Sequence, residues 1–127
     1  MVRIYVDGGT RGMVIALVDP QKNKYIIRRR KRATTNNDLE YMAIIYGIEY
    51  IKKVYPNEKV ILYSDSRLAV KQIIGEYRIK GGNLIALNTI VQEKITPWIH
   101  IKWTRRNSNL AGIHLEKKKK YLLRGKL

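Results

Sequence analysis

The amino-acid sequence predicts an α/β domain built on a five-stranded mixed sheet, in which three antiparallel strands precede two parallel ones and helices flank the sheet. Three observations predict this fold. Three β-type runs joined by short turns open the chain, two more apolar runs follow later, and segments with helical spacing of apolar residues separate and follow those runs. The predicted order is β-β-β-α-β-α-α-β-α, and we expect a single domain over residues 1–127.

The first three predicted strands form an antiparallel meander, because only short turns separate them. The run "VRIYVD" is rich in β-branched and aromatic residues and stops at Asp7, Gly8 and Gly9, a turn signal. The run "MVIALVD" predicts the second strand, which an Asp-Pro pair ends. The third is "KYIIRRRKR", in which the basic residues from Arg28 to Arg32 predict a poorly buried edge of the sheet.

The remainder of the chain alternates helices with two further strands. A helix is predicted from about Asn37 to Val54, because apolar residues recur there at helical spacing and Pro56 limits it. The run "KVILYSD" is almost continuously apolar, as expected for a strand buried on both faces. We expect further helices from Ser66 to about Ile74, over "NLIALNTIVQEKI" and from near Asn109, with a fifth strand at "WIHIKW".

This strand order places acidic residues at one edge of the sheet. Helices after the third and fourth strands imply right-handed parallel crossovers, which let the fourth strand lie parallel to the first. Asp7 and Asp65 end these two strands, so we expect them to be neighbours at the edge where sites form in open α/β sheets. Glu40 opens the intervening helix and could join them. Carboxylates held so close repel one another unless a cation lies among them.

Each of the three acids also has a structural explanation of its own. Asp7, in its "DGG" context, could be a turn former. Glu40 lies three residues after Asn37 and could complete a capping box. Asp65 could cap the following helix, with Ser64 competing for that position. These explanations do not account for the convergence of all three acids on one edge of the fold.

Charge is the strongest compositional signal. The 127 residues include 26 Lys and Arg against 10 Asp and Glu, for a formal net charge of +16. This balance favours contact with nucleic acid, because it raises the local concentration of a polyanion. A Lys-rich surface that serves solubility or thermal adaptation is the alternative, although that pattern usually brings Glu along with Lys. An anionic membrane is a weaker competitor, since no basic amphipathic segment stands apart from the core pattern.

Composition also bears on the cellular compartment in which we expect the protein. The absence of cysteine excludes disulfides and thiolate chemistry and favours an intracellular, cytoplasmic location. No stretch approaches the ~20 apolar residues that span a bilayer, and the N-terminus runs straight into a strand pattern without a signal-peptide layout. We therefore expect no membrane partner and no small-molecule organic cofactor.

Several motifs stand at the spacing of a known family. "DG" follows the first strand, "TNNDLE" spans residues 35–40 and "SDS" spans residues 64–66, while "GEYRIKGGNLIAL" and residues 103–115 add longer matches. In these segments the chain resembles type 1 ribonuclease H, in its short bacterial and archaeal form, whose patterns are "DG", "TNNxAE", "SDS", "GEYxVxNPNLxxL" and "WVPRExNxxADxL". The likeness covers essentially the whole chain and implies the ribonuclease H-like fold.

The resemblance implies hydrolysis of the RNA strand of an RNA/DNA hybrid with two divalent ions, Mg²⁺ or Mn²⁺, which suit carboxylate oxygens. It implies that Asp7 bridges both ions while Glu40 and Asp65 hold mainly the ion on the leaving-group side. It also implies a surface that contacts the hybrid, with asparagines at 2′-hydroxyls and base edges. The residues of that surface are Gly8, Gly9, Thr35, Asn36 and Asn37. Whether double-stranded RNA is also a substrate stays open.

One motif departs from the family pattern. Gly112 stands at the family's Ala and Ile113 at its fourth carboxylate, which by similarity holds the ion that activates the water. Glu116 lies three residues after Ile113, on roughly the same helical face, and is the candidate substitute. His114 points about a quarter turn away and is a poorer candidate.

Basic residues later in the chain are further candidates for nucleic-acid contact, since the chain lacks room for the basic helix of longer relatives. Arg78 and Lys80 could bind the DNA strand, or could simply belong to an exposed basic loop. Arg105 or Arg106 could steady a phosphate.

Three functions are compatible with these features. The first is a metal-dependent ribonuclease H with reduced or Mn²⁺-dependent activity. The alternative, suggested by Ile113, is a catalytically degenerate module that binds hybrid or structured RNA without cutting it. A third is another nuclease of the same fold, such as a junction resolvase, although such enzymes generally lack "TNN" before the Glu.

Overall fold

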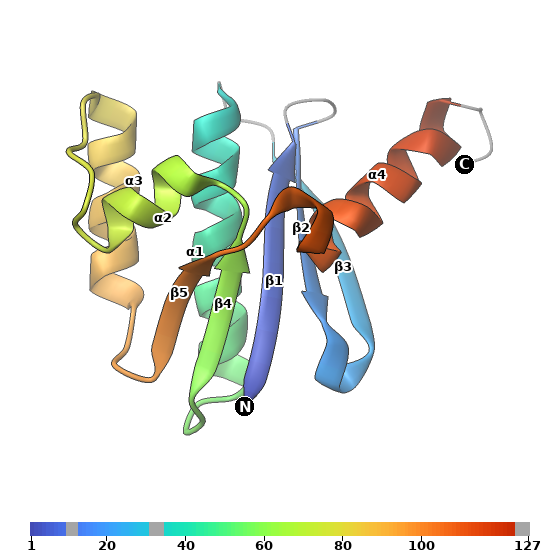
Figure 1. Cartoon of the computed structure of the whole chain (residues 1–127), viewed down its shortest axis with the longest axis horizontal. Helices are drawn as coiled ribbons and strands as arrows, with labels where there is room; N and C mark the ends of the chain where they lie inside the picture. Colours follow the sequence, from blue (N-terminus) through green and yellow to red (C-terminus); the bar gives the residue numbers. More distant parts are fainter. Residues whose placement is uncertain (10–12, 31–34, 124–127) are drawn as a thin grey trace.

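The structure is a computed structural model that describes residues 1–9, 13–30 and 35–123, with side chains through Lys118. Five strands form one mixed sheet in the order β3-β2-β1-β4-β5 (Figure 1). The strands are β1 (Val2–Gly9), β2 (Val14–Asp19), β3 (Lys24–Arg29), β4 (Val60–Ser64) and β5 (Ile99–Trp103). β2 pairs antiparallel with both β1 and β3, whereas β4 pairs parallel with both β1 and β5. The predicted mixed sheet is confirmed.

Helices cover the two faces of the sheet unequally. They are α1 (Asn36–Val54), α2 (Arg67–Ile73), α3 (Gly82–Lys94) and α4 (Leu110–Leu123), with short 3₁₀ turns at Pro20–Lys22 and Arg106–Ser108. α1 packs on β1, β2 and β4, and α2 and α3 lie against it on the same side. α4 packs on the opposite side against β1, β2 and β3 (Figure 1). On the α4 side, no described helix packs extensively on β4 and β5.

Alternating apolar side chains produce these layers. Ile4 and Leu62 point to the α1 side, are fully buried and belong to one cluster with Leu39 and Ile44 of α1. A smaller cluster lies under α4 and contains Ala16, Val18, Ala111 and Leu115. The larger cluster therefore forms the main core, and the smaller one fastens α4 to the β1–β2 side of the sheet.

A buried carboxylate joins the end of β2 to the end of α1. Asp19 is fully buried, and its Oδ2 accepts hydrogen bonds from the hydroxyls of Tyr50, at 2.5 Å, and Tyr55, at 2.8 Å. Burial raises the pKa of Asp19, but these two hydroxyls, the Gln21 amide and the Lys22 N–H outweigh burial and lower that pKa below its ordinary value. Ionised Asp19 therefore stabilises the folded chain.

The first strand is longer than the sequence predicts. Gly8 and Gly9 still pair with β2, opposite Ile15 and Val14 respectively, so β1 does not stop at the glycines. Asp7 consequently lies inside the strand, and its interpretation as a turn former is wrong. Strand pairing has overridden the local turn preference of two consecutive glycines.

Two other expectations are met only in part. Leu62 of β4 is fully buried under α1, and on the face that α4 leaves uncovered Ile61 is buried while Tyr63 is only half-buried. β3 ends at Arg29, and positions 31–32 of the predicted basic edge lie outside the described residues. Across the described helices, none is long and apolar enough to cross a membrane.

Candidate active site at the ends of strands β1 and β4

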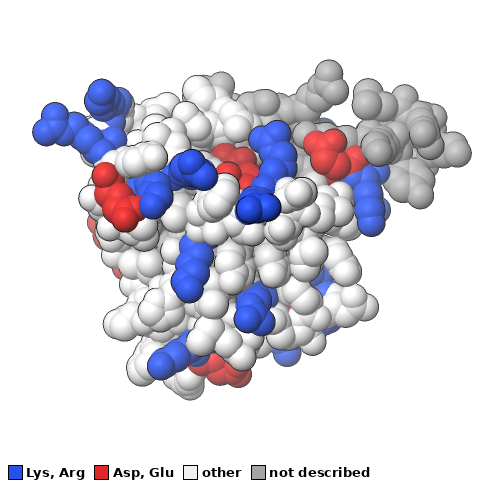
Figure 2. Space-filling view, viewed as in Figure 1, with Lys and Arg blue, Asp and Glu red and all other residues white. Residues whose placement is uncertain are grey.

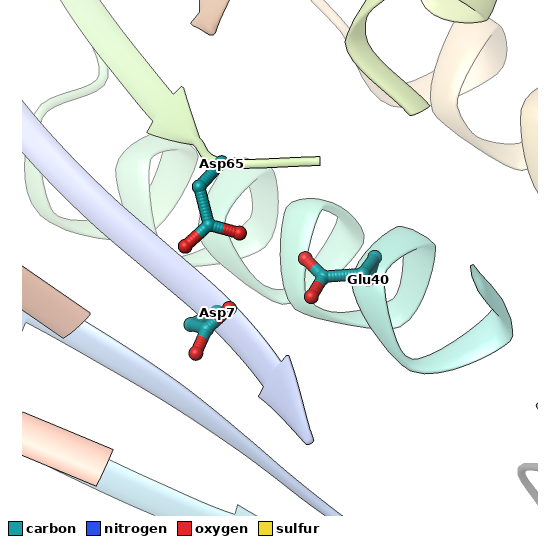
Figure 3. Close-up of side chains that lie close together, drawn as sticks. All are labelled: Asp7, Glu40 and Asp65. Atoms are coloured by element: carbon teal, nitrogen blue, oxygen red, sulfur yellow. The ribbon is translucent and has the colours of Figure 1, made fainter. Parts of the chain in front are cut away.

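Three carboxylates meet at the edge of the sheet where β1 and β4 end. One carboxylate oxygen from each of Asp7, Glu40 and Asp65 lies within 4.8 Å of the others (Figure 3). Asp7 comes from β1, Glu40 from α1, and Asp65 from the residue that follows β4. Glu40 is buried, whereas Asp7 and Asp65 are half-buried. The fold thus brings together three acids from three separate elements.

Parallel pairing of β1 with β4 positions two of these acids. Tyr5 stands opposite Tyr63 in this pairing, and Asp7 and Asp65 each follow two residues later. Because side chains two residues apart on a strand share a face, Asp7 lies on the same face as Tyr5. The register of two strands therefore fixes the distance between the two aspartates.

A glycine brings the third acid into reach. A Cβ added at Gly8 would lie 2.5 Å from Leu39 O and 2.9 Å from Glu40 N, closer than side chains pack. The first turns of α1 can therefore rest directly on the backbone of β1, which places Glu40 beside Asp7. At Gly8, a residue assigned by resemblance to the hybrid surface, the close neighbour is therefore α1.

The cap of α1 does not use Glu40. The Thr35 hydroxyl accepts a hydrogen bond from the Asp38 N–H at 3.1 Å and caps the helix. The capping box of Asn37 with Glu40, which the sequence allowed, is therefore wrong. Glu40 lies beyond the cap and is directed to the other two carboxylates (Figure 3).

The cap of α2 likewise spares Asp65. Ser66 Oγ accepts a hydrogen bond from the Ala69 N–H at 3.2 Å and caps this helix. Ser64 Oγ instead accepts from the Ser66 N–H at 3.1 Å. Neither Asp65 nor Ser64 is the cap, so the helix-cap interpretation of Asp65 is also wrong.

A buried asparagine links Asp65 to two further elements. Asn109 is fully buried, and its Nδ2 donates to Val6 O at 2.9 Å and to Asp65 Oδ2 at 3.2 Å. Its Oδ1 accepts from the Ala111 N–H at 3.1 Å and so caps α4. Sequence reasoning matched Asn109 to a motif without assigning it a role. An Asn just before a predicted helix was the available signal.

Burial and repulsion make this cluster a poor place for three negative charges. Burial, and next the charge of Asp65, raises the pKa of Asp7 to about 6, although hydrogen bonds from Glu40 and Gly8 and the charge of Arg106 partly offset this. Burial, and next the charges of Asp7 and Asp65, raises the pKa of Glu40 to about 9. Glu40 Oε2 is buried without a hydrogen-bond partner in the described part of the chain. An all-oxygen cluster with one unpartnered buried oxygen fits a hard divalent cation.

Gly112 is the residue of α4 that faces the carboxylates. A Cβ added there would lie 3.3 Å from Asp7 Oδ2 and 3.5 Å from Asp65 Oδ2. The neighbouring Ile113, in contrast, is 36% exposed. Glu116 is exposed, and it does not belong to the group of described carboxylates that lie within 4.8 Å of one another. The α4 side of the cluster is therefore lined by backbone.

The family model of RNase H matches residues 1–119. The chain belongs to the RNase H family. Among solved structures, RNase H1 from the halophilic archaeon Halobacterium salinarum NRC-1 is similar with a TM-score of 0.71 and 25% identity, over 90% of this chain and 92% of that chain. LC11-RNase H1, solved in complex with an RNA/DNA hybrid, is similar with a TM-score of 0.69 and 25% identity, over 91% of this chain and 93% of that chain.

Some relatives of this RNase H are longer proteins. The bifunctional protein Rv2228c of Mycobacterium tuberculosis is 30% identical over 118 residues, which is 85% of this chain and 32% of that protein. This chain therefore spans about a third of the length of the curated relatives that it matches. The N-terminal RNase H domain of Rv2228c shares the fold, with a TM-score of 0.69 at 24% identity.

The residues that the resemblance assigned to hybrid contact differ in how accessible they are in this RNase H. Asn36 and Asn37 are exposed in the first turn of α1, the helix that carries Glu40. Gly9 is buried and paired in β1, and the Thr35 hydroxyl is engaged in the helix cap. Among the described candidates, the two asparagines therefore present exposed side chains that the cap of α1 does not use.

The basic candidates fall into two groups. Arg105 and Arg106 are exposed just before α4, and Arg106 lies close enough to lower the pKa of Asp7. Arg78 and Lys80 are exposed in the segment between α2 and α3, where they line an open hollow together with Tyr77. Arg106 therefore acts on the carboxylate cluster, whereas Arg78 and Lys80 form a separate surface.

Proposed function

We propose that this RNase H cleaves the RNA strand of RNA/DNA hybrids in a reaction that depends on a divalent metal ion. The observation that carries the proposal is the convergence of Asp7, Glu40 and Asp65, with Glu40 Oε2 buried and unpartnered among the described residues. Membership of the family supports an endoribonuclease. LC11-RNase H1, at 25% identity, is a relative solved with an RNA/DNA hybrid.

We place Mg²⁺ or Mn²⁺ among the three carboxylates. When bound, such ions stabilise charge on a phosphate and lower the pKa of a water molecule. The protein must supply deprotonated oxygens at fixed positions, so Glu40 has to lose its proton before it can serve as a ligand. Asn109 holds Asp65 Oδ2 through its amide and thereby orients that carboxylate.

The α4 side of the carboxylate cluster supplies fewer metal ligands than the family pattern. Ile113 offers no ligand where the family has its fourth carboxylate, and Gly112 presents only backbone to Asp7 and Asp65. We therefore expect activity to be reduced or to prefer Mn²⁺. Glu116, one turn along α4 from Gly112, stays the candidate for completing the site.

We propose that the hybrid lies across the exposed start of α1. Asn36 and Asn37 stand three to four residues before Glu40 and would reach 2′-hydroxyls and base edges in the minor groove. Arg106, whose charge already acts on Asp7, is placed to hold a phosphate. The other basic residues proposed for the hybrid surface are Arg78, Lys80 and Arg105.

A cleavage assay on a hybrid labelled in its RNA strand tests this function. We expect product with Mg²⁺ or Mn²⁺ and none with chelator. Asp7→Asn should lower the rate by about 100-fold or more, because it removes a charged ligand. Glu58→Gln, a change at an exposed carboxylate outside the cluster, should leave the rate unchanged. Cleavage that persists in chelator or in Asp7→Asn would overturn the proposal.

Ile113 favours one alternative, a module that binds hybrid or structured RNA without cutting it. This alternative predicts tight hybrid binding with no turnover in either metal, and binding that Asp65→Asn leaves unchanged. Metal-dependent cleavage by the unmodified chain excludes it.

A further inference from the structure

One face of the sheet is covered over only part of its width. α4 packs on β1, β2 and β3, so β4, β5 and the adjoining part of β1 stay open on that side (Figure 1). Basic side chains stand on the middle of this open face (Figure 2). We call it the open sheet face and define it by two rows of residues that stand opposite one another on the three strands. The rows are Arg3, Ile61 and His100, and Tyr5, Tyr63 and Lys102.

Paired aromatic rings occupy the row of the open sheet face that lies nearer to the carboxylate cluster. Tyr5 and Tyr63 stack with their ring centroids 5.0 Å apart and their planes 17° from parallel. Both residues are half-buried, so part of each ring reaches solvent. A nucleobase has a flat π-face of the same kind and can extend such a stack without regard to sequence.

Cations flank these rings. Arg3 lies two residues before Tyr5 on β1, and Lys102 stands beside Tyr63 on β5, both exposed. His100 is also exposed, and none of the six residues of the open sheet face is acidic. Flat aromatic groups edged by Lys and Arg are typical of surfaces that bind single-stranded nucleic acid, where the cations meet phosphates.

The open sheet face lies next to the carboxylate cluster, and the connection from β5 to α4 crosses between them (Figure 1), where the Thr104 N–H donates to Ser64 O and Asn109 donates to Val6 O. Tyr5 precedes Asp7 by two residues, and Tyr63 precedes Asp65 by two residues, which is about 7 Å along a strand. A nucleic-acid strand that leaves the cluster in this direction would pass over this connection, which carries the exposed Arg105 and Arg106, before it meets the tyrosine pair. A second copy of the chain fits this face poorly, because Arg3 and Lys102 of two copies would repel one another.

We propose that the open sheet face binds a single-stranded nucleic-acid segment that continues from a strand held at the carboxylate cluster. Bases stack on the Tyr5–Tyr63 pair, and phosphates contact Arg3 and Lys102. The direction of this path rests on the proposed function, whereas the binding itself can be measured without cleavage. The site would favour hybrids with a single-stranded extension over blunt ones.

Fluorescence anisotropy in chelator tests the proposal with two labelled ligands, a blunt RNA/DNA hybrid and the same hybrid with an RNA extension of ~8 nucleotides. The measured quantity is the ratio of the two affinities. The unmodified chain should bind the extended ligand about tenfold more tightly. The double variant Arg3→Glu with Lys102→Glu should bring this ratio close to one. Loss of two phosphate contacts should also lower the salt slope for the extended ligand by about 1.4.

A matched control carries the same charge change elsewhere. Lys52→Glu with Lys53→Glu alters two exposed lysines at the end of α1, on the other side of the sheet, and should weaken both ligands while preserving their ratio. Tyr63→Leu should lower the ratio of the two affinities, and Tyr63→Phe, which keeps an aromatic ring, should leave it unchanged. Thermal unfolding of each variant verifies that the fold is intact.

The outcomes separate this inference from the proposed function. A ratio that falls only in the face variants supports the inference even if the hybrid is never cleaved. Normal cleavage with an equal ratio in the face and control variants overturns the inference alone. Concentration-dependent dimers that Arg3→Glu with Lys102→Glu abolishes would also overturn it, since a second copy would then occupy this face.

Discussion

Replacing Asn109 by Ala should destabilise the chain by about 2–3 kcal/mol and weaken metal binding in the same variant. Asn109 makes three hydrogen bonds while fully buried. The cap on the Ala111 N–H contributes about 1 kcal/mol. Val6 O would be left buried without this donor, at a cost of about 1–2 kcal/mol. Asp65 is half-buried, so water can replace its lost donor at little cost to the fold, but without the same orientation.

Urea unfolding in chelator measures the first effect, and calorimetric titration with Mn²⁺ measures the second. We expect the Mn²⁺ affinity of Asn109→Ala to fall about 10- to 100-fold, as for other residues that orient a metal ligand. Asn109→Asp keeps the helix cap but replaces the amide donor with an oxygen beside Asp65. It should therefore retain more stability than Asn109→Ala and bind Mn²⁺ no better.

The matched control is Asn107→Ala, an exposed asparagine two residues earlier. It should change the free energy of unfolding by less than about 0.5 kcal/mol. The reasoning is refuted if Asn109→Ala costs less than ~1 kcal/mol and binds Mn²⁺ like the unmodified chain.

Three further predictions concern the same fold. Gly8→Ala should lower the free energy of unfolding by more than about 2 kcal/mol, since the added Cβ would lie 2.5 Å from the Leu39 carbonyl oxygen. An unchanged midpoint of urea unfolding would contradict this prediction and would mean that α1 can move away from β1. The metal-free chain should lose stability in thermal unfolding as pH rises from about 4 to about 9, because the raised pKa values of Asp7 and Glu40 favour protons in the folded state. The contribution of Asp7 is lost by about pH 6 and that of Glu40 by about pH 9, so Glu40→Gln or bound Mn²⁺ should flatten the upper part of this profile. A flat profile in chelator would contradict the assignment. The contribution of Asp19 to stability has the opposite pH dependence, because its pKa is lowered in the folded chain. This contribution is present above the ordinary pKa of about 4 and is lost as pH falls through the lower folded value. Tyr50→Phe removes one hydroxyl donor and should reduce that loss in acid unfolding.

Strong periodicity made most of the fold predictable from the sequence. The helix expected from about Asn37 to Val54 begins one residue earlier and ends at the same residue. Strand order and the right-handed crossover rule correctly placed β4 parallel to β1, which is the reason that Asp7 and Asp65 become neighbours. These features depend on patterns averaged over many residues.

Local details depend on single contacts and were harder to predict. Thr35 and Ser66 cap helices that each begin within a run of several residues able to cap, so composition alone could not choose among them. Gly8 signalled a turn, yet long-range pairing with β2 kept it in the strand. At α4, counting positions in a motif drew attention to Ile113, whereas the docking of the helix directs Gly112 to the carboxylates.

The hydrogen bond from Asn109 to Val6 joins residues 103 positions apart in the chain. Contacts of such long sequence separation form late, because a large loop must close before they are made. During synthesis, the acids of β1, α1 and β4 emerge well before α4, since translation proceeds at about 5–20 residues per second. A nascent chain therefore carries all three carboxylates before it can align them. The orientation of Asp65 therefore depends on the docking of α4, because Asn109 caps this helix and also donates to Asp65.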